Sequence, residues 1–261
     1  MLTHSVPTDW AHYGTAPFTF VTEGIEAAVA EAVAPADLPA ITAIYAHHVL
    51  HGTGTFEEVP PDEAEMSHRI LAVQDRRWPW LVAEEGGRVL GFAYLTQYRP
   101  RSAYRFAGED SVYVRDDIRG QGVGKALVAA LLRRAEECGF RQVFAVIGDS
   151  ENVGSIGLHV SLGFRQVGLM RSAGAKFGRW IDVVTMQRAV GVGDGYVEYS
   201  EDAAAAAVDA SQRVEGGADA RRPGHFPRMD GEAEPRVPGD GEGPGPAGVD
   251  PGPREPGVGQ G

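Results

Sequence analysis

Three glycines, Gly120, Gly122 and Gly124, alternate with other residues between a β-branched run and an amphipathic stretch. Glycine allows a tight turn in which several backbone N–H groups point at one place, and the positive end of a following helix adds to their attraction for an anion. The spacing therefore predicts a phosphate or pyrophosphate site. Glycines in such a stretch also serve simply as turn residues, so the neighbouring residues must decide between the two.

Two common phosphate-binding motifs do not fit this turn. A Walker loop requires Gly where this chain has Arg119, and Ser or Thr where it has Ala126. A dinucleotide-binding fingerprint requires a small residue at a position that is Lys125 in one register and Leu127 in the other. The sequence thus argues against both a P-loop and a Rossmann site.

The elements around the turn alternate between strands and helices. A β-branched run at 111–114 predicts the strand before the turn, and apolar residues at helical spacing from Leu127 to Ala135 predict the helix after it. The same patterns predict strands over 28–33, 79–84, 88–95, 142–147, 165–170 and 181–187, and helices that start near 37, 62 and 152. This order indicates a single α/β domain with a mixed central sheet.

Composition changes sharply after Val190. Residues 191–261 contain 16 Gly and 9 Pro, with 14 acidic and 6 basic residues and few aromatic ones from which a core could be built. We therefore predict a disordered, acidic, Gly/Pro-rich tail over 191–261. The folded domain is expected over 28–190, and residues 1–27 are expected to form a flexible N-terminal extension.

Composition also excludes several classes of function. The chain has 261 residues with 24 Lys and Arg against 36 Asp and Glu, and a net charge of −12 disfavours a nucleic-acid partner. Its single cysteine, Cys138, permits no intrachain disulfide, and no Cys/His cluster predicts a metal site. The first residues have no basic start followed by an apolar run, and no long apolar segment follows. We expect a cytoplasmic protein with no membrane contact.

The pattern Arg-x-x-Gly-x-Gly at 119–124, placed between a strand and a helix, resembles the pyrophosphate loop of the GNAT superfamily of N-acetyltransferases. Asn152, Ser155, Leu158, His159 and residues 162–164 resemble a later signature of the same superfamily. Four separated blocks resemble its phosphinothricin and methionine sulfoximine N-acetyltransferase branch, and they occur in order at 109–114, 145–148, 155–159 and 176–180. The resemblance covers about residues 28–189. It implies the GNAT fold, α/β with about seven strands in a mixed sheet flanked by about four helices.

The resemblance also implies that acetyl-CoA is the co-substrate and that three parts of the chain hold it. These are the strand residues Val112, Tyr113 and Val114, the turn residues Arg119, Gly120, Gln121, Gly122, Val123, Gly124 and Lys125, and the single residue Asn152. A backbone N–H of the strand would stabilise the thioester oxygen as it gains charge. Asn is also a favoured helix N-cap, and the two roles are compatible.

For catalysis the reacting amine must be free of its extra proton, and an α-amine with a pKa of about 7.7–8.0 is largely protonated at neutral pH. The resemblance assigns the general base to Glu109, acting directly or through a water. A carboxylate at a strand entrance is otherwise commonly a solvated surface residue. His159 falls where many GNAT enzymes carry a tyrosine acid. Its alternative is a histidine packed against its helix.

For the acceptor, the resemblance points to two segments, Arg99-Pro100-Arg101 and Glu109-Asp110-Ser111. Arginine suits bidentate capture of a carboxylate or phosphinate, although a solvated arginine pair is the alternative. We also expect pocket positions at Phe56, Tyr104 and Arg105, surface or capping positions at His47 and His48, and a turn with packed aromatic residues at 176–180.

These expectations combine into one leading function. The chain would transfer acetyl from acetyl-CoA to the α-amine of phosphinothricin, methionine sulfoximine or a similar amino-acid analogue, by direct attack in a ternary complex. Such activity would serve detoxification, including herbicide resistance, and the resemblance implies a homodimer. A protein or peptide N-acetyltransferase of the same fold and a non-catalytic acyl-CoA sensor remain as alternatives.

Overall fold

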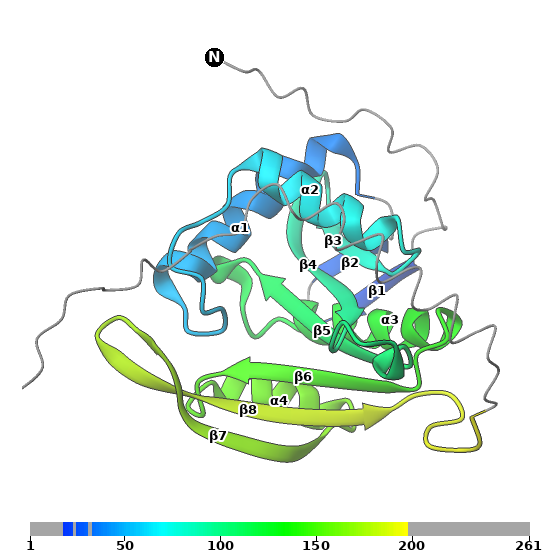
Figure 1. Ribbon diagram of the computed structural model, residues 1–261. Coiled ribbons are helices and arrows are strands. Elements are labelled where there is room, and N and C mark those ends of the chain that lie inside the picture. The colour runs from blue at the N-terminus through cyan, green and yellow to red at the C-terminus, as the bar shows by residue number, and fades with distance from the viewer. Residues whose placement is uncertain (1–17, 23–24, 31–32, 198–261) are drawn as a thin grey trace, which may run out of the picture. The chain divides into compact units, whose positions relative to one another are not determined.

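Eight strands form one sheet in the order β1-β2-β3-β4-β5-β6-β8-β7. The computed structural model describes residues 18–22, 25–30 and 33–197 (Figure 1). The strands are β1 (Phe18–Thr22), β2 (Ile25–Ala30), β3 (Trp80–Glu85), β4 (Arg88–Gln97), β5 (Ala107–Val114), β6 (Gln142–Gly148), β7 (Arg165–Lys176) and β8 (Arg179–Ala189). Neighbours are antiparallel except for the parallel pair β5 and β6. The predicted mixed sheet is confirmed.

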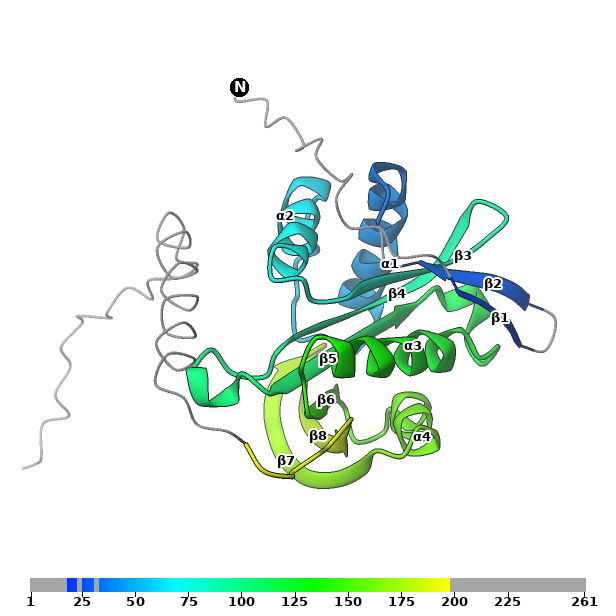
Figure 2. The ribbon, with the colours of Figure 1, turned by 90° about the vertical axis from the view of Figure 1, so that its right-hand side faces the viewer.

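Two helices cover each face of the sheet (Figure 2). On one face lie α1 (Leu38–His51) and α2 (Glu63–Gln74), and on the other lie α3 (Val123–Glu137) and α4 (Val153–Ser161). The Asp62 carboxylate accepts a hydrogen bond from Glu65 N at 2.8 Å and so caps α2 at its first turn. The four predicted helices are therefore present.

The sheet separates two apolar cores. Under α1, a stripe of apolar residues is buried in one cluster with the stacked rings of Trp80 and Phe92. This stripe comprises Leu38, Ile41, Ile44, Tyr45 and Val49. Under α3 and α4, Leu127 and Leu131 pack against strand residues such as Leu95. Burying a side chain of this size stabilises the fold by roughly 1.5–3 kcal/mol, so both layers are anchored firmly to the sheet.

The N-terminal boundary of the domain differs from our prediction. The strand expected over 28–33 is β2, and β1 precedes it in the stretch 1–27 that we had assigned to an extension. β1 pairs with β2 as a hairpin at the edge of the sheet. Five residues are too short a run to show strand periodicity clearly in the sequence, which explains the error.

At the C-terminal side, Arg141 fixes the start of the segment that we assigned to the tail. Its guanidinium donates to the carbonyl oxygens of Gly195 at 2.6 Å and Tyr196 at 3.1 Å. The rest of the predicted tail, 198–261, and residues 1–17 lie outside the described residues. Among the described helices, none is long and apolar enough to cross a membrane.

The strands β5 and β6 part at the middle of the sheet. Their ladder runs from the pair Ala107–Gln142 to the pair Asp110–Ala145. Beyond it β5 continues to Val114 and β6 to Gly148, and the two strands diverge (Figure 1). The divergence opens the sheet between its two halves, and the functional site is built in this opening.

Candidate active site

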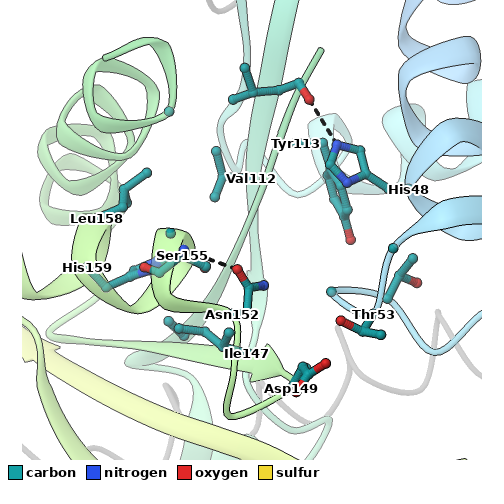
Figure 3. A pocket seen from close by; sticks show the side chains of 18 of the residues that line it. His48, Thr53, Val112, Tyr113, Ile147, Asp149, Asn152, Ser155, Leu158 and His159 are labelled. Carbon is teal, nitrogen blue, oxygen red and sulfur yellow. Dashed lines mark hydrogen bonds between the residues drawn. The ribbon is translucent and has the colours of Figure 1, made fainter. Parts of the chain in front are cut away.

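A cleft of about 1250 Å³ occupies the opening between β5 and β6. Small-molecule sites commonly measure about 300–1,000 Å³, so the cleft has room for a large ligand or for two substrates together. Its walls come from the end of α1 with the following loop, from β5, from the glycine turn, from α4, and from the β7–β8 turn (Figure 3).

The backbone of β5 faces the cleft at every second residue. Tyr98 N bonds Ala107 O and Arg115 N bonds Leu90 O, so the odd-numbered positions of β5 direct their backbone groups toward β4. In an antiparallel pair the intervening residues point their N–H and C=O groups the other way. Val112 and Val114 therefore present backbone groups to the cleft. Tyr113, which we had grouped with them, is paired to β4 through its backbone and lines the cleft with its ring.

His48 closes part of this edge. Its Nε2 lies 2.9 Å from Val114 O (Figure 3), and because a carbonyl only accepts, Nε2 carries the proton. Burial lowers the pKa of His48, which outweighs the opposite effect of this hydrogen bond and keeps the ring neutral at neutral pH. We had expected a capping or surface histidine, and this expectation was wrong. The sequence did hold a signal, since His48 follows Ile41 by seven residues on the buried face of α1.

The glycine turn has the geometry of an anion cradle. Gly120 and Gly122 adopt φ values of +80° and +85°, a left-handed conformation that favours glycine. A Cβ on Gly124 would lie 2.8 Å from Leu158 Cδ1, so the third glycine allows α3 and α4 to approach. Gly122, the N-cap of α3, makes no side-chain cap hydrogen bond, so the first N–H groups of the helix are left for an anion such as a pyrophosphate.

Most of the predicted turn residues line the cleft. Arg119 and Lys125 are exposed at its rim, and Arg119 Nε lies 3.2 Å from Asp116 Oδ1. Gln121 lies outside the cleft wall. The turn thus offers positive charge at the rim and backbone donors within, as the pyrophosphate of acetyl-CoA requires.

Asn152 joins the site from the start of α4. Its Oδ1 accepts a hydrogen bond from Ser155 N at 3.2 Å and so caps the helix (Figure 3). The side-chain amide also lies against the loop after α1, because a Cβ on Gly54 would be 3.8 Å from Asn152 Nδ2. The Oδ1 of Asn152 is occupied by the hydrogen bond that caps α4, whereas its Nδ2 donor is directed at the cleft. Both roles weighed for Asn152 are therefore compatible with its geometry.

Glu109 lies at the inner end of the cleft, half-buried in β5. Burial raises the pKa of its carboxyl, the charge of Arg99 opposes the rise, and the charge of Asp110 adds to it. A carboxylate whose pKa is raised holds an abstracted proton more firmly, which suits a general base. Strand alternation places its side chain on the face covered by α1 and α2.

Asp110 leaves β5 on the opposite face and meets His159 of α4. Asp110 Oδ2 lies 2.9 Å from His159 Nε2, and both side chains are almost fully buried. His159 Nδ1 lies 2.7 Å from Ser155 O, so this nitrogen carries a proton. Burial alone would lower the pKa of His159, but the hydrogen bond and the charge of Asp110 outweigh burial and raise it. Both ring nitrogens are engaged with the protein, which favours the structural alternative over a free acid.

The arginines assigned to the acceptor are not among the residues that line the cleft, although the charge of Arg99 acts on Glu109. The Arg99 guanidinium stacks over the Tyr98 ring at 4.3 Å, and Gln97 Nε2 donates to the backbone oxygens of Arg99 and Arg101. Arg99, Pro100 and Arg101 belong to the connection after β4 and do not line the cleft. Of the three additional pocket candidates, Phe56 lines the cleft, whereas Tyr104 and Arg105 do not. Ser111, like Glu109 and Asp110, does line it.

Residues 42–164 match the acetyltransferase (GNAT) family. Phosphinothricin N-acetyltransferase of Alcaligenes faecalis is 58% identical over 158 residues, which are 60% of this chain and 80% of that protein. The chain belongs to the GNAT family. As a GNAT protein it is also similar to the L-methionine sulfoximine/L-methionine sulfone acetyltransferase of Pseudomonas paraeruginosa, with 44% identity over 58% of this chain and 88% of that protein.

A solved structure extends the likeness to the whole fold of this GNAT chain. The GNAT superfamily phosphinothricin acetyltransferase from Sinorhizobium meliloti, crystallised in complex with acetyl-CoA, has a TM-score of 0.64 at 45% identity. The match covers 67% of this chain and 94% of that chain. The predicted family, fold and co-substrate are confirmed, and the protein is an acetyl-CoA-dependent acyltransferase. In the described part of the chain, no group of three or more His, Cys, Asp or Glu could hold a metal ion.

Proposed function

We propose that this acyltransferase acetylates the α-amine of phosphinothricin, methionine sulfoximine or a similar amino-acid analogue. One observation carries the proposal. Glu109, a half-buried carboxyl whose pKa burial raises, lies in the same strand as the backbone donors of Val112 and Val114. A base and a thioester-binding edge thus lie on one strand, a few residues apart, as direct attack by an amine requires. The names of the relatives from Alcaligenes faecalis and Pseudomonas paraeruginosa support this acceptor class.

In the proposed reaction acetyl-CoA supplies an activated acyl group, and the chain binds it and manages the amine proton. Glu109 accepts that proton, directly or through a water, while the carbon–nitrogen bond forms and the carbon–sulfur bond breaks. One backbone N–H of the cleft edge of β5, at Val112 or Val114, faces the acyl oxygen and stabilises its developing charge, while the other backbone groups of that edge bind the pantetheine arm. The departing thiolate takes its proton from solvent, since both nitrogens of His159 are bonded within the protein.

The acceptor would bind on the face of the sheet that carries Glu109. Ser111 and Tyr94 lie on this face and share a hydrogen bond, and both line the cleft. Thr53, Thr55 and Phe56 border the same space from the loop after α1. This wall combines hydroxyl groups with one aromatic ring, which fits a small polar amino-acid analogue with a short aliphatic chain.

The decisive experiment is release of the CoA thiol by the purified protein given acetyl-CoA and one amine at a time. The panel contains phosphinothricin, methionine sulfoximine, methionine sulfone and the ordinary amino acids, and protein without amine corrects for the single thiol of Cys138. Saturable release with the first three is expected. Tight acetyl-CoA binding without release for any of them would reject the proposal and favour a peptide acceptor or a sensor.

We further propose that the enzyme works as a cytoplasmic homodimer with a role in detoxification. Large apolar side chains are exposed on β7, β8 and their turn, including Trp180 at 68% and Phe177 at 56% exposure, together with Val167, Leu169 and Met170. Exposed apolar groups gathered on one edge are typical of an interface. Light scattering after size-exclusion chromatography tests this, because a monomeric mass at micromolar concentration would reject the dimer.

A further inference from the structure

Lys176 is buried at the end of β7, with 3% of its surface exposed, and the proposed chemistry does not use it. Its Nζ donates to Gly52 O and Thr55 O, each at 2.9 Å. A buried ammonium is costly unless its donors are hydrogen-bonded, so these two contacts are what allow it to stay there. The lysine therefore ties two carbonyls of the loop after α1 to a strand more than 100 residues away in the sequence.

The loop that Lys176 holds, residues 52–56, forms one wall of the cleft. It is seated closely on two glycines of the sheet. A Cβ on Gly148 would lie 2.1 Å from Thr53 O, and one on Gly174 would lie 2.4 Å from the Phe56 ring. The absence of side chains at these positions lets the loop lie directly against β6 and β7. Its height above the sheet is thus set by backbone contact and by Lys176.

Arg179 secures the same wall from the other end of the β7–β8 turn. Its guanidinium pairs with the Asp149 carboxylate, which also accepts a hydrogen bond from the Thr53 side chain. The side chains of Thr53 and Asp149 lie next to each other at the lower edge of the cleft (Figure 3). The turn between Lys176 and Arg179 therefore fixes the loop both directly and through Asp149.

The loop lies on the acceptor side of the cleft. It follows α1, and Thr55 Oγ1 lies 3.2 Å from the hydroxyl of Tyr45, whose ring packs edge-on against Tyr113. These residues occupy the face of the sheet that carries Glu109. The predicted acetyl-CoA contacts come instead from the edge of β5, the glycine turn and the start of α4. Movement of the loop should thus affect the acceptor far more than the thioester substrate.

We propose that Lys176 is a positioning residue that holds loop 52–56 in place and thereby sets the affinity for the amine acceptor. This inference rests on the proposed function for the identity of the acceptor, but not for the contact between Lys176 and the loop. Exchanging Lys176 for Met keeps most of the aliphatic stem and leaves the carbonyls of Gly52 and Thr55 without their donor. Loss of two charged hydrogen bonds should loosen the loop markedly.

The test compares wild type with Lys176→Met and with Arg171→Met, which removes an exposed cation from the same strand, 77% exposed in its side chain. Amide hydrogen exchange of residues 52–57, kcat, the KM for the amine and the Kd for acetyl-CoA are measured. For Lys176→Met we expect exchange of the loop and the KM for the amine each to rise about tenfold or more. The Kd for acetyl-CoA should change less than about twofold, and Arg171→Met should match wild type throughout.

Unchanged exchange and KM in folded Lys176→Met would overturn the proposal, and so would an equal loss of acetyl-CoA binding, which indicates a merely structural role. If Lys176→Met does not fold, Arg179→Gln loosens the loop through Asp149 and should shift the KM and loop exchange in the same direction, with no shift counting against the proposal. If wild type acetylates none of the amines, the proposed function fails, whereas loop exchange still decides whether Lys176 holds the loop.

Discussion

Glu109 and Asp110 are neighbours in β5, yet their side chains leave the sheet on opposite faces. Glu109 lines the face covered by α1 and α2, whereas Asp110 is buried on the other face against His159. One strand therefore separates a half-exposed base from a closed carboxylate–imidazole pair. The two residues that the sequence assigned to catalysis, Glu109 and His159, both line the cleft but approach it from opposite faces of the sheet.

Glu109→Gln should lower kcat by about 10²–10⁴-fold with little change in acetyl-CoA binding, because the amide cannot accept the amine proton. The reaction needs the carboxylate, so wild-type activity should fall as the pH drops through the raised pKa of Glu109, above the ordinary value of 4.5. This acid limb should vanish in the variant. A pH profile of kcat checks both points, with Glu85→Gln as an exposed control on β3. Full activity in Glu109→Gln would remove it from the mechanism.

His159→Gln should lower stability by about 3 kcal/mol, because it leaves the Asp110 carboxylate buried without its partner. The folded-state pKa of His159 is raised above 6.5 by Asp110 despite burial. Its charge therefore stabilises the fold fully at pH values below the unfolded pKa, and this contribution is lost as the pH rises through the folded pKa. Urea denaturation across pH should show the difference from wild type shrinking as pH increases.

If the stability difference between His159→Gln and wild type stayed constant with pH, the prediction that His159 and Asp110 form a charged pair would be wrong. The double variant Asp110→Asn/His159→Gln should lose less stability than the summed losses of the two single variants, because the residues share one buried contact. In the folded single variant kcat should stay within about tenfold of wild type, since His159 offers no free proton. A much larger fall in kcat, confined to pH values below the pKa of His159, where the wild-type ring is protonated, would instead restore His159 as the acid.

His48→Ala should weaken acetyl-CoA binding about fivefold, because removing a hydrogen bond worth about 1 kcal/mol frees Val114 O and the end of β5. Isothermal titration with CoA measures the effect. His47→Ala serves as the control, since His47 precedes it on α1 with a side chain 38% exposed. Equal effects of the two substitutions would show that the contact with Val114 does not shape the binding edge.

Gly122→Ala should weaken acetyl-CoA binding strongly, because a side chain strains the left-handed turn and displaces the N–H groups at the start of α3. Gly87→Ala is a matched control in the β3–β4 hairpin, with φ of +81° against +85° at Gly122 and no neighbour near its added Cβ. Both variants should lose about 1 kcal/mol of stability. Only Gly122→Ala should lose affinity for CoA, and equal affinity losses would argue against a cradle.

The arrangement of helices and strands was largely predictable, because most elements carry their own periodicity and turn residues. Leu127 and Leu131 mark α3, and Asp62 and Asn152 mark helix starts by their capping chemistry. β1 was not predicted because an edge strand of five residues shows little alternation of apolar and polar residues. The glycine turn could be predicted because a left-handed backbone conformation strongly favours glycine at those positions.

The site was predictable only where residue type or family pattern determined the geometry. Strand alternation separates Val112 and Val114 from Tyr113, and this depends on which edge of β5 pairs with β4. His48 and Lys176 act through contacts with distant backbone oxygens, Val114 O and the carbonyls of Gly52 and Thr55, that no local pattern encodes. Long-range contacts of this kind follow from the packed fold and not from spacing along the chain.

The two walls of the cleft are held mainly by different contacts, and this has a consequence for how such an enzyme changes its substrate. The glycine turn and α4 meet through Gly124 and Leu158, whereas the loop after α1 is held by Lys176 from the β7–β8 hairpin. Substitutions at Thr53, Thr55 or Phe56 can alter the amine that fits without disturbing the acyl donor. A few mutations in this one short loop can thus change the acceptor, while the residues that bind acetyl-CoA stay the same.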